Sequence, residues 1–228
     1  MKIFKLTLFI TVLFLSACSG KKAKNDLTKE NIRGRVSKIT ESKYTGVEKF
    51  GEIQKDSLLS QFIYKFDRKG MRIYNKASDD ARWKLVYDDM HNLIELNSYN
   101  EDGSLDYKSI HEYDEMGNQI EGNIYRSDGS LIAKQTYKFD KKGYKIEETY
   151  VNFSIYKTPG AGSGWKYTYK YDEKGNMIEK IWYYSSGNIG SITTYKYDEY
   201  DKTGNWIKKA EFKDGKLESV TERVFEYY

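Results

Sequence analysis

The sequence predicts an all-β fold, an antiparallel meander of repeated β-hairpins that forms a curled or barrel-like sheet. Three observations predict it. Aromatic and charged residues alternate with a period of two, as in "YKYDEKGN" at 169–176, and this alternation is typical of a strand with one buried face. Such runs end in a turn signal of the form Asp-x-x-Gly, with His91 in place of the glycine in one copy. The whole unit recurs at a nearly constant spacing, which indicates a structural repeat.

The N-terminus has the pattern of an export signal. Lys2 and Lys5 precede an apolar run that ends in Leu15-Ser16-Ala17, and a basic start, an apolar stretch and small residues are the parts of such a signal. The run is shorter than the ~20 residues that a membrane-spanning helix needs. Cys18, the only cysteine of the chain, follows directly.

The "LSAC" segment that ends at Cys18 resembles the lipobox of bacterial lipoproteins. The resemblance implies that residues 1–17 are removed and that Cys18 is lipidated, so that the protein is held on a membrane through its N-terminal lipid. We therefore expect a signal peptide at 1–17, a lipidated tether at 18–30 and a single β-hairpin-repeat domain at 31–228.

Composition limits the kinds of partner. With no second cysteine, the mature chain has no disulfide framework. Its net charge is +4 with the signal and +2 once Lys2 and Lys5 are removed. Basic and acidic residues alternate along the domain, which indicates a solvated surface and no nucleic-acid interface.

The repeat is marked by aspartates, each preceded by an aromatic residue. Asp88, Asp114 and Asp140 are spaced 26 residues apart, and Asp172 follows after 32. Asp198 lies 26 residues after Asp172 and continues the series, and Asp67 begins it. Lysine, valine or glutamate lies two positions before each aspartate, which gives the alternation of a strand.

We expect the residues after these aspartates to be structural turns. An aspartate at the first position accepts a hydrogen bond from a backbone N–H two residues on, and a glycine three positions later supplies the left-handed conformation of a bulged hairpin. A further turn of this kind, "DKTGN", begins at Asp201. The expected turn residues are Asp67, Asp114, Asp140, Asp172, Gly70, Gly117, Gly143, Gly175 and Gly204.

The strand after each turn contains an isoleucine at a fixed place, for example Ile178, and an aromatic residue or valine five positions further on, for example Tyr183. An odd spacing places the two on opposite faces unless a bulge intervenes, and the sequence leaves both arrangements open. Second turns such as "NEDGS" (100–104) complete each hairpin. About fourteen strands result, from one near 32–44 to the last at 217–227, with a long Pro- and Gly-containing loop at 152–164.

The "YKYDEKGN" units resemble the YD (RHS-type) repeats of bacterial cell-surface proteins over roughly residues 58–228. The aromatic-Asp-x-x-Gly-Asn core matches at 113–118, 171–176 and 200–205. The period here is longer and the copies are fewer than in the large shells of that family. The resemblance implies an uncharacterised bacterial lipoprotein that binds carbohydrate or protein.

The motifs of the common enzyme classes are missing from the sequence. The aspartates of the repeat are accounted for by turn geometry, and the two histidines, His91 and His111, have no cysteine or carboxylate cluster at metal-ligand spacing. No nucleophile elbow, phosphate-binding loop or dinucleotide fingerprint occurs. We therefore expect no catalytic residue, no metal and no cofactor, and a protein that is not an enzyme.

Two functions remain. The first is a lipid-anchored, non-catalytic module that binds a glycan or an envelope protein through exposed aromatic rings, for which the candidate residues are Trp165, Trp182, Tyr183 and Tyr184 beside the long loop. The second is a structural or assembly lipoprotein whose sheet edges pair with a partner's strand. In both cases we expect the protein in the cell envelope, at the outer membrane, on either its periplasmic or its surface face.

Overall fold

The computed structural model describes residues 25–73, 83–90, 92–153 and 163–228. The predicted signal peptide at 1–17, Cys18 and most of the loop predicted at 152–164 lie outside these residues. Within them the structure has one short helix, α1 (Asp26–Lys29), and fourteen strands. The strands are β1 (Val36–Lys49), β2 (Glu52–Phe66), β3 (Arg72–Ile73), β4 (Trp83–Tyr87), β5 (Leu93–Tyr99), β6 (Leu105–Tyr113), β7 (Gln119–Arg126), β8 (Leu131–Phe139), β9 (Lys145–Asn152), β10 (Ser163–Tyr171), β11 (Met177–Tyr184), β12 (Ile189–Tyr200), β13 (Trp206–Lys213) and β14 (Lys216–Tyr227).

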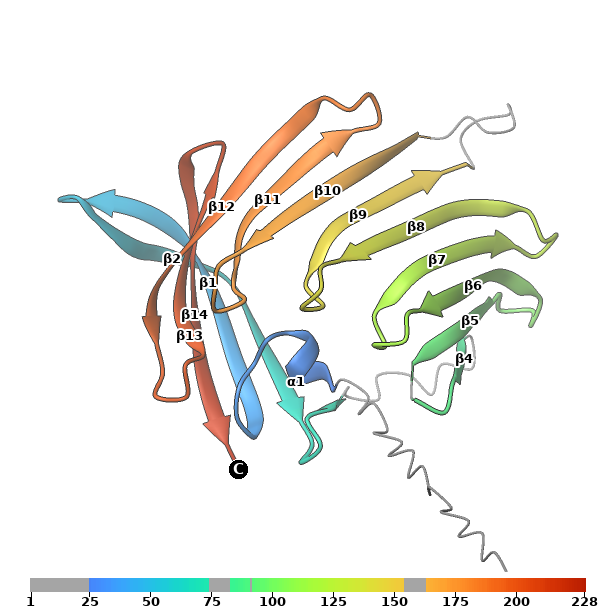
Figure 1. The fold of residues 1–228 in the computed structure, drawn as a ribbon, viewed down its shortest axis with the longest axis horizontal. Coiled ribbons are helices and arrows are strands. Elements are labelled where there is room, and N and C mark those ends of the chain that lie inside the picture. Colours follow the sequence, from blue (N-terminus) through green and yellow to red (C-terminus); the bar gives the residue numbers. More distant parts are fainter. Residues whose placement is uncertain (1–24, 74–82, 91, 154–162) are drawn as a thin grey trace, which may run out of the picture.

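The predicted fold class is confirmed, because all fourteen described strands pair antiparallel in a single sheet. From β4 to β14 the strands follow one another as a meander, but β1 then pairs with β14, so the order is β3-β2-β1-β14 and onward to β4. The N-terminal and C-terminal strands thus lie side by side, as Figure 1 shows.

The sheet is curled. Its edges, β3 and β4, are only ten residues apart in sequence at Ile73 and Trp83, a separation that at full extension spans about 36 Å. A flat sheet of this size would be about 60 Å wide, since neighbouring strands lie about 4.8 Å apart. Figure 1 shows the strands in an arc from β2 round to β4.

The predicted aspartate turns form as expected. The carboxylate oxygen Oδ1 of Asp114 accepts hydrogen bonds from the backbone N–H of Met116 (2.8 Å) and of Asn118 (2.9 Å), and Asp67 and Asp140 are bonded in the same way. The glycine of each turn is left-handed, with φ between +75° and +86°: Gly70, Gly117, Gly143, Gly175 and Gly204.

The turn predicted at Asp201 is confirmed, whereas Asp198, which continues the 26-residue spacing, does not begin a turn. Asp198 lies inside β12, and the turn begins three residues later at Asp201, whose Oδ1 accepts from the N–H of Thr203 and of Asn205. The pairing of β12 with β13 shifts register twice, around Glu199, and this irregularity absorbs the extra residues.

The sequence left open whether a bulge follows each aspartate turn at the isoleucine, and the structure shows that it does in five units. In the pairing of β10 with β11, Lys170 lies opposite Glu179 and Tyr171 opposite Met177, so that Ile178 is the extra residue of a bulge. The same register shift skips the corresponding residue in four other units, namely Ile94, Ile120, Ile146 and Ile207.

The hydrophobic core lies at one end of the sheet, where the aspartate turns gather. Leu27 of α1 and Ile32 pack against Ile39 and Phe66, and Figure 1 shows α1 beside the converging strand ends. Residues 25–33 also bond to the aspartate turns, for example from Asn31 Nδ2 to the carbonyl of Lys174 (3.0 Å). Residues 25–30, which the sequence suggested as part of the tether at 18–30, therefore pack against the domain.

The described helix is too short and too polar to cross a membrane.

Candidate binding face

The two faces of the sheet differ in chemistry. We call the face that α1 covers, with Ile39, Tyr64 and Phe225, the inner face, and the opposite one the outer face. Residues directly opposite each other in an antiparallel pair share a face, so the registers assign every strand. On the outer face lysines and glutamates pair across strands, as in Lys108–Glu95 and Lys134–Glu121.

Three of the four predicted binding residues meet on the inner face. Trp165 lies opposite Tyr184, and Tyr167 lies opposite Trp182. Tyr183 lies opposite Lys166 and therefore points to the outer face, where its ring lies 4.6 Å from the Lys166 ammonium. The candidates therefore divide into an inner group and one outer tyrosine.

The inner rings form two groups of contacting rings on neighbouring strands. The ring of Trp165 stacks on Tyr150 of the neighbouring strand, with centroids 5.4 Å apart, and contacts Tyr167 at 4.8 Å. Trp182 contacts Tyr184 at 4.5 Å. We call Tyr150, Trp165, Tyr167, Trp182 and Tyr184 the aromatic cluster. Tyr184 is 50% exposed, so the cluster offers an open ring to a ligand.

Gly190 allows the indole of Trp182 to lie close to the backbone of β12. A Cβ atom at Gly190 would lie 2.4 Å from the Trp182 ring, closer than real side chains pack. A glycine at position 190 is thus needed for the Trp182 indole to occupy its place against β12. Gly190 is also the extra residue of a bulge, since Trp182 pairs with Ser191 and Tyr183 with Ile189.

All four tryptophans of the chain contact rings of the inner face. Trp165 and Trp182 belong to the aromatic cluster, Trp83 lies 5.8 Å from Tyr107 in an edge-on arrangement, and Trp206 lies 5.5 Å from Tyr197. The inner face is thus far richer in large aromatic surface than the outer face.

Ion pairs also lie on the inner face, between the rings. Glu148 accepts hydrogen bonds from Tyr169 Oη (2.8 Å), Lys145 Nζ (2.6 Å) and Gln135 Nε2 (2.7 Å). These donors, Lys145 and Tyr169 in particular, keep the pKa of Glu148 below its usual value although burial opposes them. The carboxylate therefore stays ionised and holds three strands together.

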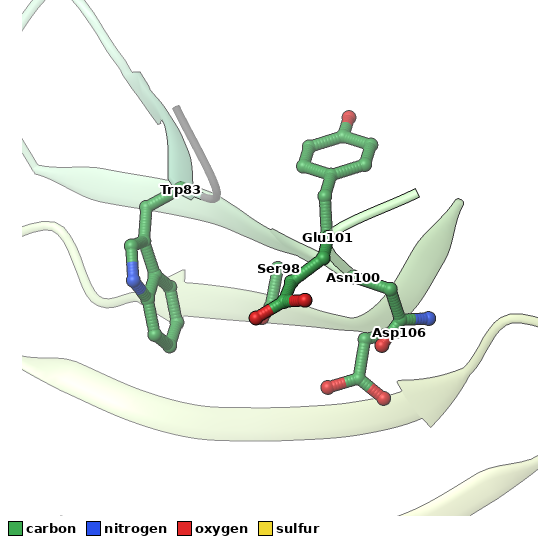
Figure 2. A pocket seen from close by; sticks show the side chains of 6 residues that line it. Trp83, Ser98, Asn100, Glu101 and Asp106 are labelled. Carbon is green, nitrogen blue, oxygen red and sulfur yellow. The ribbon is translucent and has the colours of Figure 1, made fainter. Parts of the chain in front are cut away.

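A shallow hollow of 280 Å³ lies at the β4 edge of the sheet, well away from β10. Figure 2 shows Trp83 on one side of it, with Asn100, Glu101 and Asp106 on the other. Its carboxylates have no histidine or further acid beside them in the lining. Within the described part of the chain, no three His, Cys, Asp or Glu side chains are placed to hold a metal ion.

Half-buried tyrosines make the fold sensitive to alkali. Burial, together with nearby carboxylates or tyrosines, raises the pKa of Tyr137, Tyr171 and Tyr195 to about 12. A raised folded-state pKa gives stability that is complete below the unfolded value of about 10 and is lost as the pH rises toward 12. We expect denaturant midpoints to fall between pH 10 and pH 12, with phenolate absorbance that titrates in two groups. A single titration near pH 10 with an unchanged midpoint would contradict this.

Sequence reasoning missed several residues of this face. Tyr150 and Tyr167 belong to the same alternating runs as the predicted residues, so their period could have identified them. Lys180 lies opposite Tyr169, with its ammonium 3.9 Å from the centroid of Tyr167, and nothing in the alternation distinguishes it from lysines of the outer face.

Comparisons with known proteins identify no family. No protein-family model matches the chain, and no curated protein matches it. Among solved structures, a porin-like protein from Bacteroides uniformis superposes with a TM-score of 0.48 at 10% sequence identity. The alignment covers 85% of this chain and 98% of that chain. This likeness concerns the course of the backbone and has no bearing on function.

Proposed function

We propose that this protein is a lipid-anchored component of the cell envelope, of the YD-repeat type, which binds a glycan on its inner face without catalysis. The observation on which the proposal depends is the aromatic cluster with the exposed ring of Tyr184. Aromatic rings offer large, rigid apolar surfaces against which sugar rings can stack, and the tyrosine hydroxyls add hydrogen bonds.

The position of the N-terminus supports this arrangement. Asn25 lies at the aspartate-turn end, bonded to the carbonyl of Lys69, and Cys18 precedes it by seven residues, which span at most about 25 Å. A lipid on Cys18 would hold the aspartate-turn end toward the membrane. Trp165 and Tyr184 lie at the ends of β10 and β11 that are far from the aspartate turn joining these strands. The aromatic cluster would therefore face away from the bilayer.

Neighbouring residues on opposite faces give a matched test. Tyr184→Ala removes an inner ring and Tyr183→Ala an outer one, at adjacent positions of β11. In titrations with glycans that a glycan array identifies, we expect Tyr184→Ala to weaken binding at least about tenfold, which corresponds to about 1.4 kcal/mol, and Tyr183→Ala to leave it unchanged.

The double variant Trp165→Ala, Trp182→Ala should abolish this binding, with circular dichroism as the control for folding. An empty array together with a pull-down from envelope extracts that recovers no polymer would overturn the proposal. Recovery of a protein alone would point to a protein ligand for the same face.

A second function, assembly through sheet edges, is favoured by strand β2. Among the described residues β2 has β1 on one side, but β3 covers its other side only at Lys65 and Phe66. Leu58, Leu59, Phe62 and Ile63 of this edge are 54–57% exposed, and unpaired apolar edges accept further strands. Crosslinking of an Ile63→Cys variant in native membranes should then trap a larger species, and monomer alone would count against assembly.

A further inference from the structure

Two lysines of the inner face have no acidic partner among the described residues. The ammonium of Lys180 on β11 lies over Tyr167, and that of Lys209 on β13 lies 5.0 Å from the ring centroid of Tyr195 and 5.1 Å from that of Trp206. Neither forms an ion pair within the described chain. Both are held by the faces of aromatic rings.

The carboxylates of this part of the inner face are already paired with other cations. Glu148 bonds to Lys145 at 2.6 Å, Glu211 to Lys43 at 3.1 Å and Glu41 to the Nε of Arg223 at 2.7 Å. Among the described residues, neither Lys180 nor Lys209 forms a direct ion pair with one of these three carboxylates. Two ammonium groups of the inner face, those of Lys180 and Lys209, are therefore held by aromatic rings and not by a direct ion pair.

The surroundings disfavour both charges. Burial lowers the pKa of Lys180, with Glu148 acting against it. Burial and then the nearby Arg223 lower the pKa of Lys209, with Glu41 and Glu211 acting against them. A partly desolvated cation with no counter-ion reduces stability unless something else compensates for it. An anion that binds on this face would supply the missing charge.

We propose that the ligand of the inner face is an acidic polysaccharide, whose sugar rings lie against the aromatic cluster and whose carboxylate or sulfate groups accept hydrogen bonds from Lys180. This rests on the proposed glycan binding and adds the chemical class. Lys209 lies two strands and about four residues from Lys180, a distance of roughly 16 Å. A polymer with acidic groups along its length can reach both lysines, whereas a single small anion can reach only one.

The chain offers a matched control for Lys180. Lys166 of β10 is held in the same way, 4.6 Å from the ring centroid of Tyr183, but on the outer face. Lys180→Gln and Lys166→Gln therefore remove the same charge from the same kind of contact and keep most of the length of the side chain. A difference in glycan affinity between the two variants therefore shows which face binds the ligand, since both variants lose one lysine.

The experiment screens the full-length protein on an array of carboxylated, sulfated and neutral glycans. It then titrates oligogalacturonate, its neutral methyl ester and heparin oligosaccharides. We expect the acidic glycans to bind at least about tenfold more tightly than the ester, as a charge-assisted hydrogen bond provides, and to weaken with added salt. Lys180→Gln should remove this preference and Lys166→Gln should preserve it.

The outcomes separate this inference from the proposed function. Equal binding of the acid and its ester, still dependent on Tyr184, would overturn the acidic preference and leave glycan binding intact. Acidic binding that survives Lys180→Gln, or that is lost equally in Lys166→Gln, would overturn the assignment to the inner face. If no glycan binds, or only an acidic protein does, both proposals fail.

Discussion

Asn205→Ala is expected to lower the free energy of unfolding by about 3 kcal/mol, because it removes three hydrogen bonds from a buried side chain. Asn205 is 5% exposed. Its Oδ1 accepts from the N–H of Arg33 (2.8 Å), and its Nδ2 donates to the carbonyl of Arg33 (2.9 Å) and to Tyr227 Oη (2.8 Å). The alanine variant leaves both backbone groups of Arg33 without this partner, so the N-terminal segment should detach first.

Asn176 provides the control, since it occupies the same turn position. Its side-chain amide donates to Asp172 Oδ2 and to Tyr200 Oη, whereas that of Asn205 bonds to the N-terminal segment. We expect Asn176→Ala to lose stability without faster hydrogen exchange at residues 26–33, whereas Asn205→Ala shows both effects in urea unfolding and exchange measurements. Equal exchange in the two variants would show that Asn205 does not hold the segment.

Gly164→Ala is expected to cost about 3 kcal/mol through overpacking between two strands. A Cβ atom at Gly164 would lie 2.2 Å from the backbone carbonyl oxygen of Tyr150, and backbone cannot turn aside as a side-chain tip can. To relieve the contact, β9 and β10 would have to separate where Trp165 stacks on Tyr150. The variant should therefore also weaken glycan binding.

Gly129→Ala is the comparison for this position. Gly129 has φ of +81°, and a Cβ atom added there would meet no other atom within 4 Å, so alanine incurs only the left-handed backbone cost of about 1 kcal/mol. Thermal and urea unfolding of both variants would show the difference. A smaller loss for Gly164→Ala than for Gly129→Ala would mean that the strands separate freely at this point.

The local elements of the fold could be predicted because they follow from neighbouring residues. The hydrogen bonds of Asp114 and the positive φ of Gly117 are properties of a four-residue turn, and they recur wherever the pattern recurs. The 26-residue spacing leads to Asp198 and not to the turn at Asp201, because the aromatic-Asp pattern occurs twice, at 197–198 and at 200–201. Only the second is followed by a glycine at the right distance.

The arrangement of the faces could not be predicted in the same way. A bulge changes which side chains share a face. The spacing of five residues from Ile178 to Tyr183 therefore could not show whether the two share a face until the strand registers were known. The pairing of β1 with β14 joins residues far apart in the chain, such as Lys38 and Glu226, and no local pattern specifies it. Lys180 became distinctive only when the inner carboxylates proved to be paired elsewhere.

The most direct test of the inner-face account is hydroxyl-radical footprinting of the tryptophan and tyrosine side chains, with and without a bound acidic glycan. The account predicts that Trp165, Trp182 and Tyr184 become protected while Tyr183, on the other side of the same strand, is modified as before. Protection of Tyr183 with unchanged modification of Trp165 and Trp182 would contradict it.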